Sequence, residues 1–168
     1  TFDTVCVDPN VVELYVDGTA TGDTATCASS AAAIAVTTPL AENDSDITFT
    51  ETDVAGNESG QSPVLTVTVD TTAPVAPAAP DMTAGTDSGP NDSDDLTSTA
   101  QPDFTTVCTD ADTMTLYIDG VANSTRLCAS SAVQLAPLAA LADGTYSVTY
   151  TATDPAGNES APSTVLPI

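Results

Sequence analysis

Histidine and lysine are absent from this sequence, arginine occurs once, and aromatic residues make up only 4% of the chain. Without histidine the chain lacks the usual general base, proton shuttle and zinc ligand, which argues against triad hydrolysis and most zinc chemistry. Without lysine it has no Schiff-base nucleophile and no partner for a Lys–Asn isopeptide crosslink. These absences argue against an enzyme.

Long hydrophobic runs are also missing. A membrane-spanning helix needs about 18 or more apolar residues in a row, and no such stretch occurs. No charged-then-apolar signal peptide opens the sequence. We therefore expect a soluble, already processed chain with no membrane insertion.

Positive charge is the third shortage. Acidic residues number 24 against one basic residue, which gives a formal net charge of -23. This field repels the phosphates of nucleic acid, so nucleic acid is not expected as a partner. The acidic groups also repel one another and destabilise a compact state unless cations condense on it. Salt or a divalent metal is therefore a candidate for stabilising the fold.

What the sequence does contain is an internal repeat. At an offset of 102, eight residues recur: Phe2, Val5, Cys6, Asp8, Leu14, Tyr15, Asp17 and Gly18 correspond to Phe104, Val107, Cys108, Asp110, Leu116, Tyr117, Asp119 and Gly120. After a one-residue deletion, CASSA at 27–31 matches 128–132, and TDVAGNES at 52–59 matches TDPAGNES at 153–160. The stretch 71–99 has no counterpart before residue 1. The chain thus carries one module twice, and the first copy is expected to lack its leading strand.

Each copy has the period-two pattern of half-buried strands. Val12, Leu14 and Val16 alternate with more polar neighbours, and Met114, Leu116 and Ile118 do the same in the second copy. An Asp-Gly pair follows each run and suits a tight hairpin turn. Several short strands with regular turns predict an all-β fold built from β-sandwiches.

The four cysteines fall two in each copy, at separations of 21 and 20 residues. We expect the disulfides Cys6–Cys27 and Cys108–Cys128, the natural interpretation for an exported protein. Four buried free thiols are the alternative, and the lack of CxxC spacing argues against a metal site. By the chain-entropy estimate each disulfide would add about 3 kcal/mol to the free energy of unfolding. This amount matters because small sandwiches bury a lower fraction of their surface.

Several further motifs carry a family resemblance: residues 70–74 (DTTAP) at the junction, 86–89 (TDSG) leading to 94–97 (DDLT), 101–104 (QPDF), and the Asp-x-Ala-Gly-Asn-x-Ser turns. Together they resemble the bacterial immunoglobulin-like repeats of giant surface adhesins, over nearly the whole chain. In that family such modules form long extender rods exported to the bacterial surface, usually with calcium at the junctions. The cysteines depart from the family pattern.

The resemblance implies two tandem immunoglobulin-like β-sandwiches, the first lacking its leading strand. Residues 1–70 form repeat 1, residues 71–80 a proline-rich linker, and residues 81–168 repeat 2. It also implies an extracellular location at the bacterial cell surface. The expected partners are neighbouring repeats of the same polypeptide or fibre, with host-surface or matrix glycans and proteins contacted through other domains.

Seven aspartates are candidate ligands for Ca²⁺, which takes six to eight oxygen ligands. Asp87, Asp94 and Asp95 lie in the acidic loop of repeat 2. In a β-sandwich the chain enters at the end where the loops between strands B and C and between strands F and G also lie. Four others are therefore expected to converge on the junction: Asp70, Asp110, Asp112 and Asp154. A solvated acidic loop is the alternative.

The function we favour from the sequence is a structural spacer, stiffened by calcium and disulfides. Two alternatives stay open: a glycan-binding or protein-binding module, and a fibre subunit whose missing strand is supplied by another chain. A glycosidase is disfavoured, because it needs two carboxyls that flank a shaped cleft.

Overall fold

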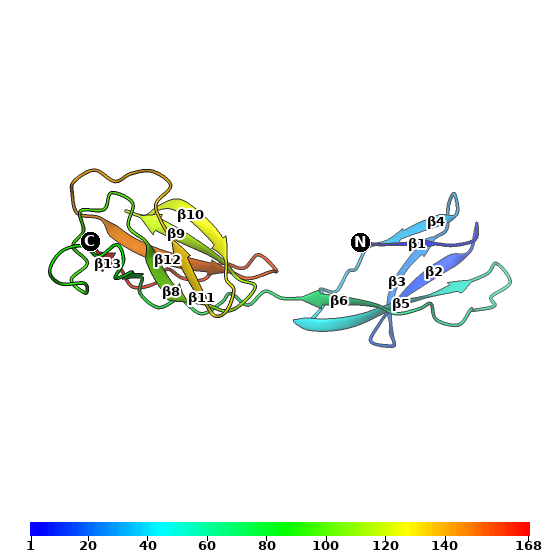
Figure 1. The fold of residues 1–168 in the computed structure, drawn as a ribbon. Coiled ribbons are helices and arrows are strands. Elements are labelled where there is room, and N and C mark those ends of the chain that lie inside the picture. Colours follow the sequence, from blue (N-terminus) through cyan, green and yellow to red (C-terminus); the bar gives the residue numbers. More distant parts are fainter. The chain divides into compact units, whose positions relative to one another are not determined.

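The computed structural model describes residues 1–168 and consists of strands and loops without helices. It contains no helix that is long and apolar enough to cross a membrane. The chain divides into two compact units, Thr1–Asp70 and Thr71–Ile168, called here the first and second unit (Figure 1). The predicted all-β fold is therefore confirmed.

The first unit has six strands in two antiparallel sheets. They are β1 (Phe2–Val5), β2 (Val11–Val16), β3 (Thr19–Thr26), β4 (Ala31–Ile34), β5 (Asn43–Thr52) and β6 (Leu65–Val69). One sheet has the order β3-β2-β5-β6, and the other contains β1 and β4. This two-layer arrangement is a β-sandwich.

The second unit repeats this topology with one strand added at its start. Its strands are β7 (Asp81–Met82), β8 (Phe104–Val107), β9 (Thr113–Ile118), β10 (Val121–Leu127), β11 (Ala132–Leu135), β12 (Ser147–Thr153) and β13 (Leu166–Pro167). The sheet β10-β9-β12-β13 corresponds to the larger sheet of the first unit. The smaller sheet has the order β11-β8-β7, so β7 is the strand without a counterpart.

The Asp-Gly pairs form the hairpin turns that the sequence predicts. Asp17 and Gly18 connect β2 to β3 with φ angles of 50° and 74°, and Asp119 and Gly120 connect β9 to β10 with 50° and 75°. Two consecutive positive φ angles match the right-handed twist of a hairpin. The Asp17 carboxylate also accepts a hydrogen bond from the N–H of Asp46 at 2.8 Å, which ties the turn to β5.

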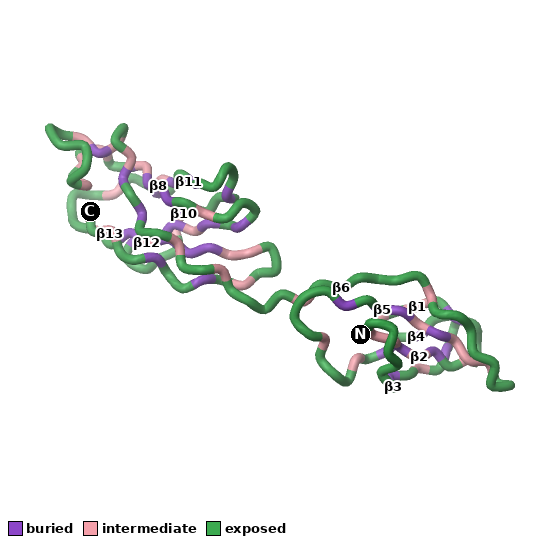
Figure 2. Tube along the Cα trace, turned by 90° about the horizontal axis from the view of Figure 1, so that it is seen from below, coloured by how far each residue is buried: buried purple, intermediate pink, exposed green.

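Each unit has its own core between its two sheets. The first core consists of Cys6, Val12, Leu14, Cys27, Ala32, Ile34 and Ile47. The second consists of Met82, Phe104, Met114, Leu116, Ile118, Cys128, Val133, Leu135, Val148, Tyr150 and Ala152. Figure 2 shows that most buried positions lie along the strands, where they alternate with exposed ones, and that the loops are mostly exposed. The second core is larger and contains two fully buried aromatic rings.

Both expected disulfides are present. Cys6 and Cys27 have Cα atoms 5.9 Å apart, and those of Cys108 and Cys128 are 6.1 Å apart. Cys6 directly follows β1 and Cys27 directly follows β3, which belong to different sheets. Each disulfide therefore links the two layers of its sandwich.

The proline-rich stretch 71–80 is grouped with the second unit. Within that unit, Thr106 Oγ1 donates a hydrogen bond to the carbonyl oxygen of Ala78 at 3.1 Å. Pro80 is buried, and the next two residues form β7. The end of this stretch therefore packs onto the second sandwich.

Candidate functional site

The Asp-x-Ala-Gly-Asn turns after β5 and β12 are closed by hydrogen bonds to their own aspartates. Asn57 donates to the Asp53 carboxylate from its backbone N–H and from Nδ2, both at 2.9 Å. Asn158 makes the same two donations to Asp154, at 2.8 and 2.9 Å. These bonds, led by the one from the asparagine side chain, lower the pKa of both carboxyls. The recurring turns therefore have a structural role.

A second pair of aspartates supports the CASSA hairpins. Ser29 and Ser30, between β3 and β4, have φ angles of 55° and 63°, a region that is costly for residues with a Cβ atom. The Asp8 carboxylate accepts hydrogen bonds from both N–H groups at 2.9 Å. In the second unit Asp110 accepts from the N–H of Ser131 at 2.6 Å. Asp110, predicted as a calcium ligand, thus supports this turn.

Asp87 is the most deeply buried of the predicted calcium ligands, with 4% of its surface exposed. Its Oδ2 accepts a hydrogen bond from the N–H of Asp95 at 3.2 Å, whereas Oδ1 is buried without a hydrogen-bond partner. Burying a carboxylate oxygen without a partner is costly. The chain has only one basic side chain, Arg126, and it donates to the carbonyl oxygen of Gln134. Asp87 is therefore a candidate for binding a cation.

Asp95, whose N–H donates to Asp87, has three acidic neighbours, one of which is Asp87. The pKa of Asp95 is raised, first by burial and then by the negative charges of Asp81, Asp87 and Asp94. Asp94 Oδ1 accepts from the N–H of Leu96 at 3.2 Å. We call Asp81, Asp87, Asp94 and Asp95 the Asp87 cluster. The sequence analysis missed Asp81, although its place beside Met82 at the start of the acidic loop was a usable signal.

The remaining predicted ligands lie elsewhere. Asp112 is buried, and its pKa is raised by burial and by the charge of Asp154. Asp112 shares a cavity with residues 75–78, whereas Asp95 shares one with the C-terminal Ile168. Asp70 directly follows β6 as the last residue of the first unit. No three carboxylate or cysteine side chains converge into a group that could hold a metal ion.

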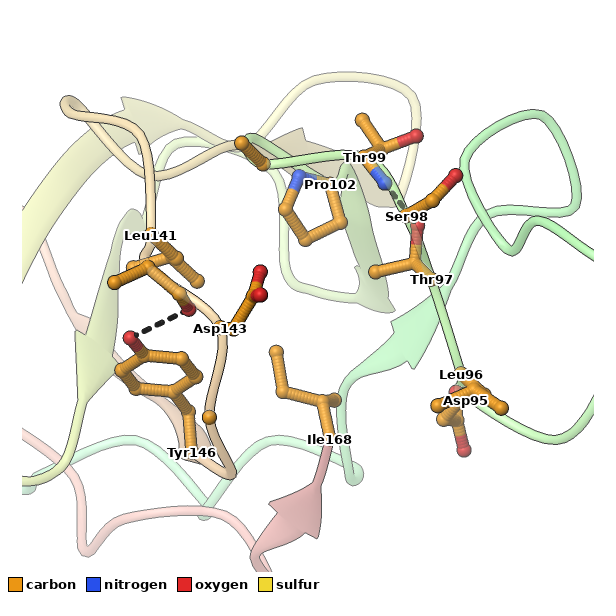
Figure 3. Close-up of a pocket in the computed structure, with 13 residues that line it drawn as sticks. Asp95, Leu96, Thr97, Ser98, Thr99, Pro102, Leu141, Asp143, Tyr146 and Ile168 are labelled. Atoms are coloured by element: carbon orange, nitrogen blue, oxygen red, sulfur yellow. Dashed lines mark hydrogen bonds between the residues drawn. The ribbon is translucent and has the colours of Figure 1, made fainter.

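The cavity that Asp95 lines is small, with a volume of about 130 Å³. Figure 3 shows Leu141, Tyr146 and Ile168 on one side and Thr97–Thr99 on the other. Tyr146 donates its hydroxyl hydrogen bond to the carbonyl oxygen of Ala142 at 2.9 Å. Pockets for organic ligands usually measure about 300–1,000 Å³. This cavity suits water or an ion better than an organic ligand.

Taken together, the antiparallel two-layer units, their hairpin turns and the aspartates that hold those turns define an immunoglobulin-like β-sandwich protein. The sequence model of a family described as bacterial Ig-like domain matches residues 73–168. The chain belongs to this family, which confirms the resemblance seen in its motifs.

Solved structures give further similarities. The fibronectin(III)-like modules of Clostridium thermocellum CbhA share 19% identity at a TM-score of 0.51, with 98% of this chain and 80% of that chain covered. A Ca²⁺-stabilized adhesin that helps an Antarctic bacterium bind ice shares 22% identity at a TM-score of 0.45, covering 96% of this chain and 39% of that chain. The BSP domain of a biofilm associated protein shares 17% identity at a TM-score of 0.38, covering 95% and 24%. The search of curated proteins found no match.

Proposed function

We propose that the chain is a spacer segment in the extender region of an adhesin exported to the bacterial surface. Its partners are neighbouring repeats of the same polypeptide or fibre, and the proposal includes no enzymatic step. Membership of a bacterial Ig-like family supports this assignment. The disulfide in each unit supports an extracellular location, because such bonds persist in oxidising compartments.

The observation that carries the proposal is that the polar residues common to both repeats hold the fold. Besides the turn aspartates, Ser62 Oγ accepts from the N–H of Phe49 and Ser163 Oγ from that of Tyr150, both at 3.0 Å. Ser59 and Ser160 bind β5 and β12 in the same way. A spacer has to keep its folded length. A repeat whose recurring polar groups maintain the sandwich suits that role.

A spacer under load is expected to unfold in two steps, each shortened by its disulfide. Cys6 and Cys27 are 21 residues apart, and Cys108 and Cys128 are 20 apart. At about 3.4 Å per extended residue, each disulfide keeps about 60–65 Å of chain from extending when its unit unfolds. Single-molecule pulling should therefore give two unfolding steps that each lengthen by about this amount in reducing buffer.

Two outcomes would contradict the spacer. One is a single unfolding step whose length does not respond to a reductant. The other is specific, saturable binding of the oxidised chain to a glycan or a host-surface protein, since a spacer contributes no receptor site. A glycan array and a cell-binding assay with the intact chain measure this second outcome.

Calcium is the proposed cofactor, and the Asp87 cluster is its proposed place within the second unit. The buried, unpartnered Oδ1 of Asp87 supports this, because a cation would supply the missing partner. Asp95 lies beside Asp87, and the charges of Asp81 and Asp94 in turn act on Asp95. Calcium also accepts backbone carbonyl oxygens and water as ligands, so a site does not need three converging carboxylates. The junction set of Asp70, Asp110, Asp112 and Asp154 stays a prediction.

Calcium is expected to raise the melting temperature of the second unit. At a calcium concentration ten times the Kd, a single site adds about 1.4 kcal/mol to the free energy of unfolding. For a unit of this size this raises the melting temperature by about 5–10 °C. Asp87→Asn should remove this response. It should also leave the calcium-free protein at least as stable as the wild type, because it removes an unpaired buried charge. Asp92→Asn, an exposed position in the same loop, is the matched control and should respond like the wild type.

Differential scanning calorimetry and native mass spectrometry, with and without calcium, measure the shift and the stoichiometry. Magnesium should substitute poorly, because it requires tighter octahedral geometry and releases water reluctantly. If sodium chloride of equal ionic strength gave the same shift, charge screening would explain the effect and the site would be refuted. An equal calcium response in Asp87→Asn would refute the placement at Asp87.

A further inference from the structure

The chain contains three Asp-Gly pairs, and their aspartates differ in hydrogen bonding. An aspartate cyclises most readily before glycine, because glycine has no side chain to hinder its own backbone nitrogen. Two of the pairs are the hairpin turns that begin at Asp17 and Asp119, and the third begins at Asp143 in the loop between β11 and β12. All three aspartates are exposed, so burial does not distinguish them.

The two hairpin aspartates are held by the neighbouring strand. The N–H of Asp17 donates to the carbonyl oxygen of Asp46, and the N–H of Asp46 donates to Asp17 Oδ1, both at 2.8 Å. Asp119 exchanges the same two hydrogen bonds with Ser147, also at 2.8 Å. Each carboxylate is thereby fixed to the next strand, and it would have to give up a hydrogen bond before it could react with the nitrogen of the following glycine.

Asp143 lacks both restraints. Its carboxylate accepts no hydrogen bond, and the N–H groups of Asp143 and Gly144 donate none. Figure 3 likewise shows no hydrogen bond between Asp143 and the other residues around the cavity that it lines. The loop is closed on both sides of the pair, because the Tyr146 hydroxyl donates to the carbonyl oxygen of Ala142 at 2.9 Å. The pair is thus an unrestrained link within a closed loop.

We propose that Asp143-Gly144 is a site of spontaneous isoaspartate formation in the folded protein, and that the two hairpin pairs are protected. The Gly144 nitrogen attacks Cγ of the protonated Asp143 carboxyl. The N–Cγ bond forms, the Cγ–OH bond breaks, and the hydroxyl leaves with the N–H proton as one water, which gives a cyclic succinimide. Water then adds to this ring without any oxidation or reduction. The proposal does not depend on the spacer assignment.

The ring opens in two ways. Attack of water at Cγ breaks the N–Cγ bond and restores aspartate, whereas attack at the main-chain carbonyl carbon of Asp143 breaks its bond to the Gly144 nitrogen. The second product is isoaspartate, in which the backbone runs through Cγ and is longer by one carbon atom. Because the Tyr146 hydroxyl bonds to Ala142 across this pair, the longer backbone should disturb that hydrogen bond and leave the two sheets intact.

The test incubates the intact oxidised chain in mildly acidic buffer and follows each Asp-Gly pair by peptide mapping with electron-transfer fragmentation, which distinguishes isoaspartate from aspartate. Isoaspartate should accumulate at Asp143 about tenfold or more faster than at Asp17 and Asp119, because loss of a hydrogen bond to a charged group slows the hairpin pairs by about that factor. In the reduced chain in concentrated urea the three rates should become similar, because the sequence is the same and the hydrogen bonds are gone.

Gly144→Ala is the matched variant. A Cβ atom at this position would lie 3.7 Å from the Tyr146 ring, an ordinary van der Waals contact, and Gly144 does not have a positive φ angle. The variant should therefore fold like the wild type, which calorimetry checks. Its methyl group hinders the attacking nitrogen, so isoaspartate at Asp143 should form several-fold more slowly, with the rates at Asp17 and Asp119 unchanged.

Three results would overturn the proposal. The first is equal accumulation at Asp143 and at the hairpin pairs in the folded chain, or none at Asp143. The second is a difference between the pairs that persists in urea, which would assign it to the neighbouring sequence rather than to hydrogen bonding. The third is an unchanged rate at Asp143 in Gly144→Ala. Because the rates at the three pairs are compared within one molecule, differences in buffer or handling cannot imitate the expected result.

Discussion

The first unit is expected to unfold at about 37 °C when its disulfide is removed by Cys6→Ala and Cys27→Ala, while the second unit stays folded. Loss of a native disulfide from a small secreted domain typically costs about 2–5 kcal/mol. Small domains have little stability beyond that amount. In the first unit the two cysteines are also two of the seven core residues, and their bond links the two sheets.

The matched variant is Cys108→Ala with Cys128→Ala in the second unit. It should lose a similar free energy, but from a core of eleven residues that includes Phe104 and Tyr150. We therefore expect a lowered melting temperature without loss of the fold. Calorimetry measures the two transitions, and amide exchange assigns each one to a unit. Equal loss of structure in both double variants would show that the difference between the cores does not decide stability.

Tyr150→Ala is expected to destabilise the second unit by about 3–5 kcal/mol, as is typical for truncation of a large buried ring. Tyr150 is 0% exposed and lies opposite Leu116 in the β9–β12 pair. Its hydroxyl donates to the carbonyl oxygen of Phe104 at 2.9 Å, which connects the two sheets. Burial is also the main reason why the pKa of this hydroxyl is raised.

Two further substitutions separate the contribution of the Tyr150 hydroxyl from that of its ring and compare the two units. Tyr150→Phe keeps the ring and removes the hydroxyl, so it should cost about 1 kcal/mol. Phe49→Ala, at the equivalent position of the first unit, should cost less than Tyr150→Ala because its ring is only partly buried. Urea unfolding followed by the near-ultraviolet signal and by amide exchange gives these values. A larger loss for Phe49→Ala than for Tyr150→Ala would contradict the burial that we describe.

Local features of the sequence were enough to predict much of the fold. The period-two pattern around Leu14 and Leu116 depends only on the alternation of side chains along a strand, so it indicated the buried face directly. The Asp-Gly pairs predicted hairpins because few residues tolerate positive φ. The pairing of cysteines within each repeat followed from their number and spacing, and both bonds are present.

The candidate site depended on tertiary structure. The sequence grouped seven aspartates as calcium ligands by residue type, but the folded chain gives them different surroundings. Asp110 and Asp154 accept hydrogen bonds from nearby turns, whereas Asp87 is buried with an unpartnered oxygen. Asp81 joined the cluster because the Asp95 carboxylate accepts a backbone hydrogen bond from Met82, the residue that follows Asp81.

By itself the sequence determined the fold class, the repeat and the disulfides, because these follow from patterns within short stretches of chain. Tertiary structure alone decided which carboxylate oxygen lacks a hydrogen-bond partner and which aromatic rings are fully buried. Those properties depend on the burial and hydrogen bonding that each group finds after distant segments pack together. Phe104, for example, lies opposite Met82 of β7 and is fully buried, and Met82 reaches it from 22 residues earlier in the chain.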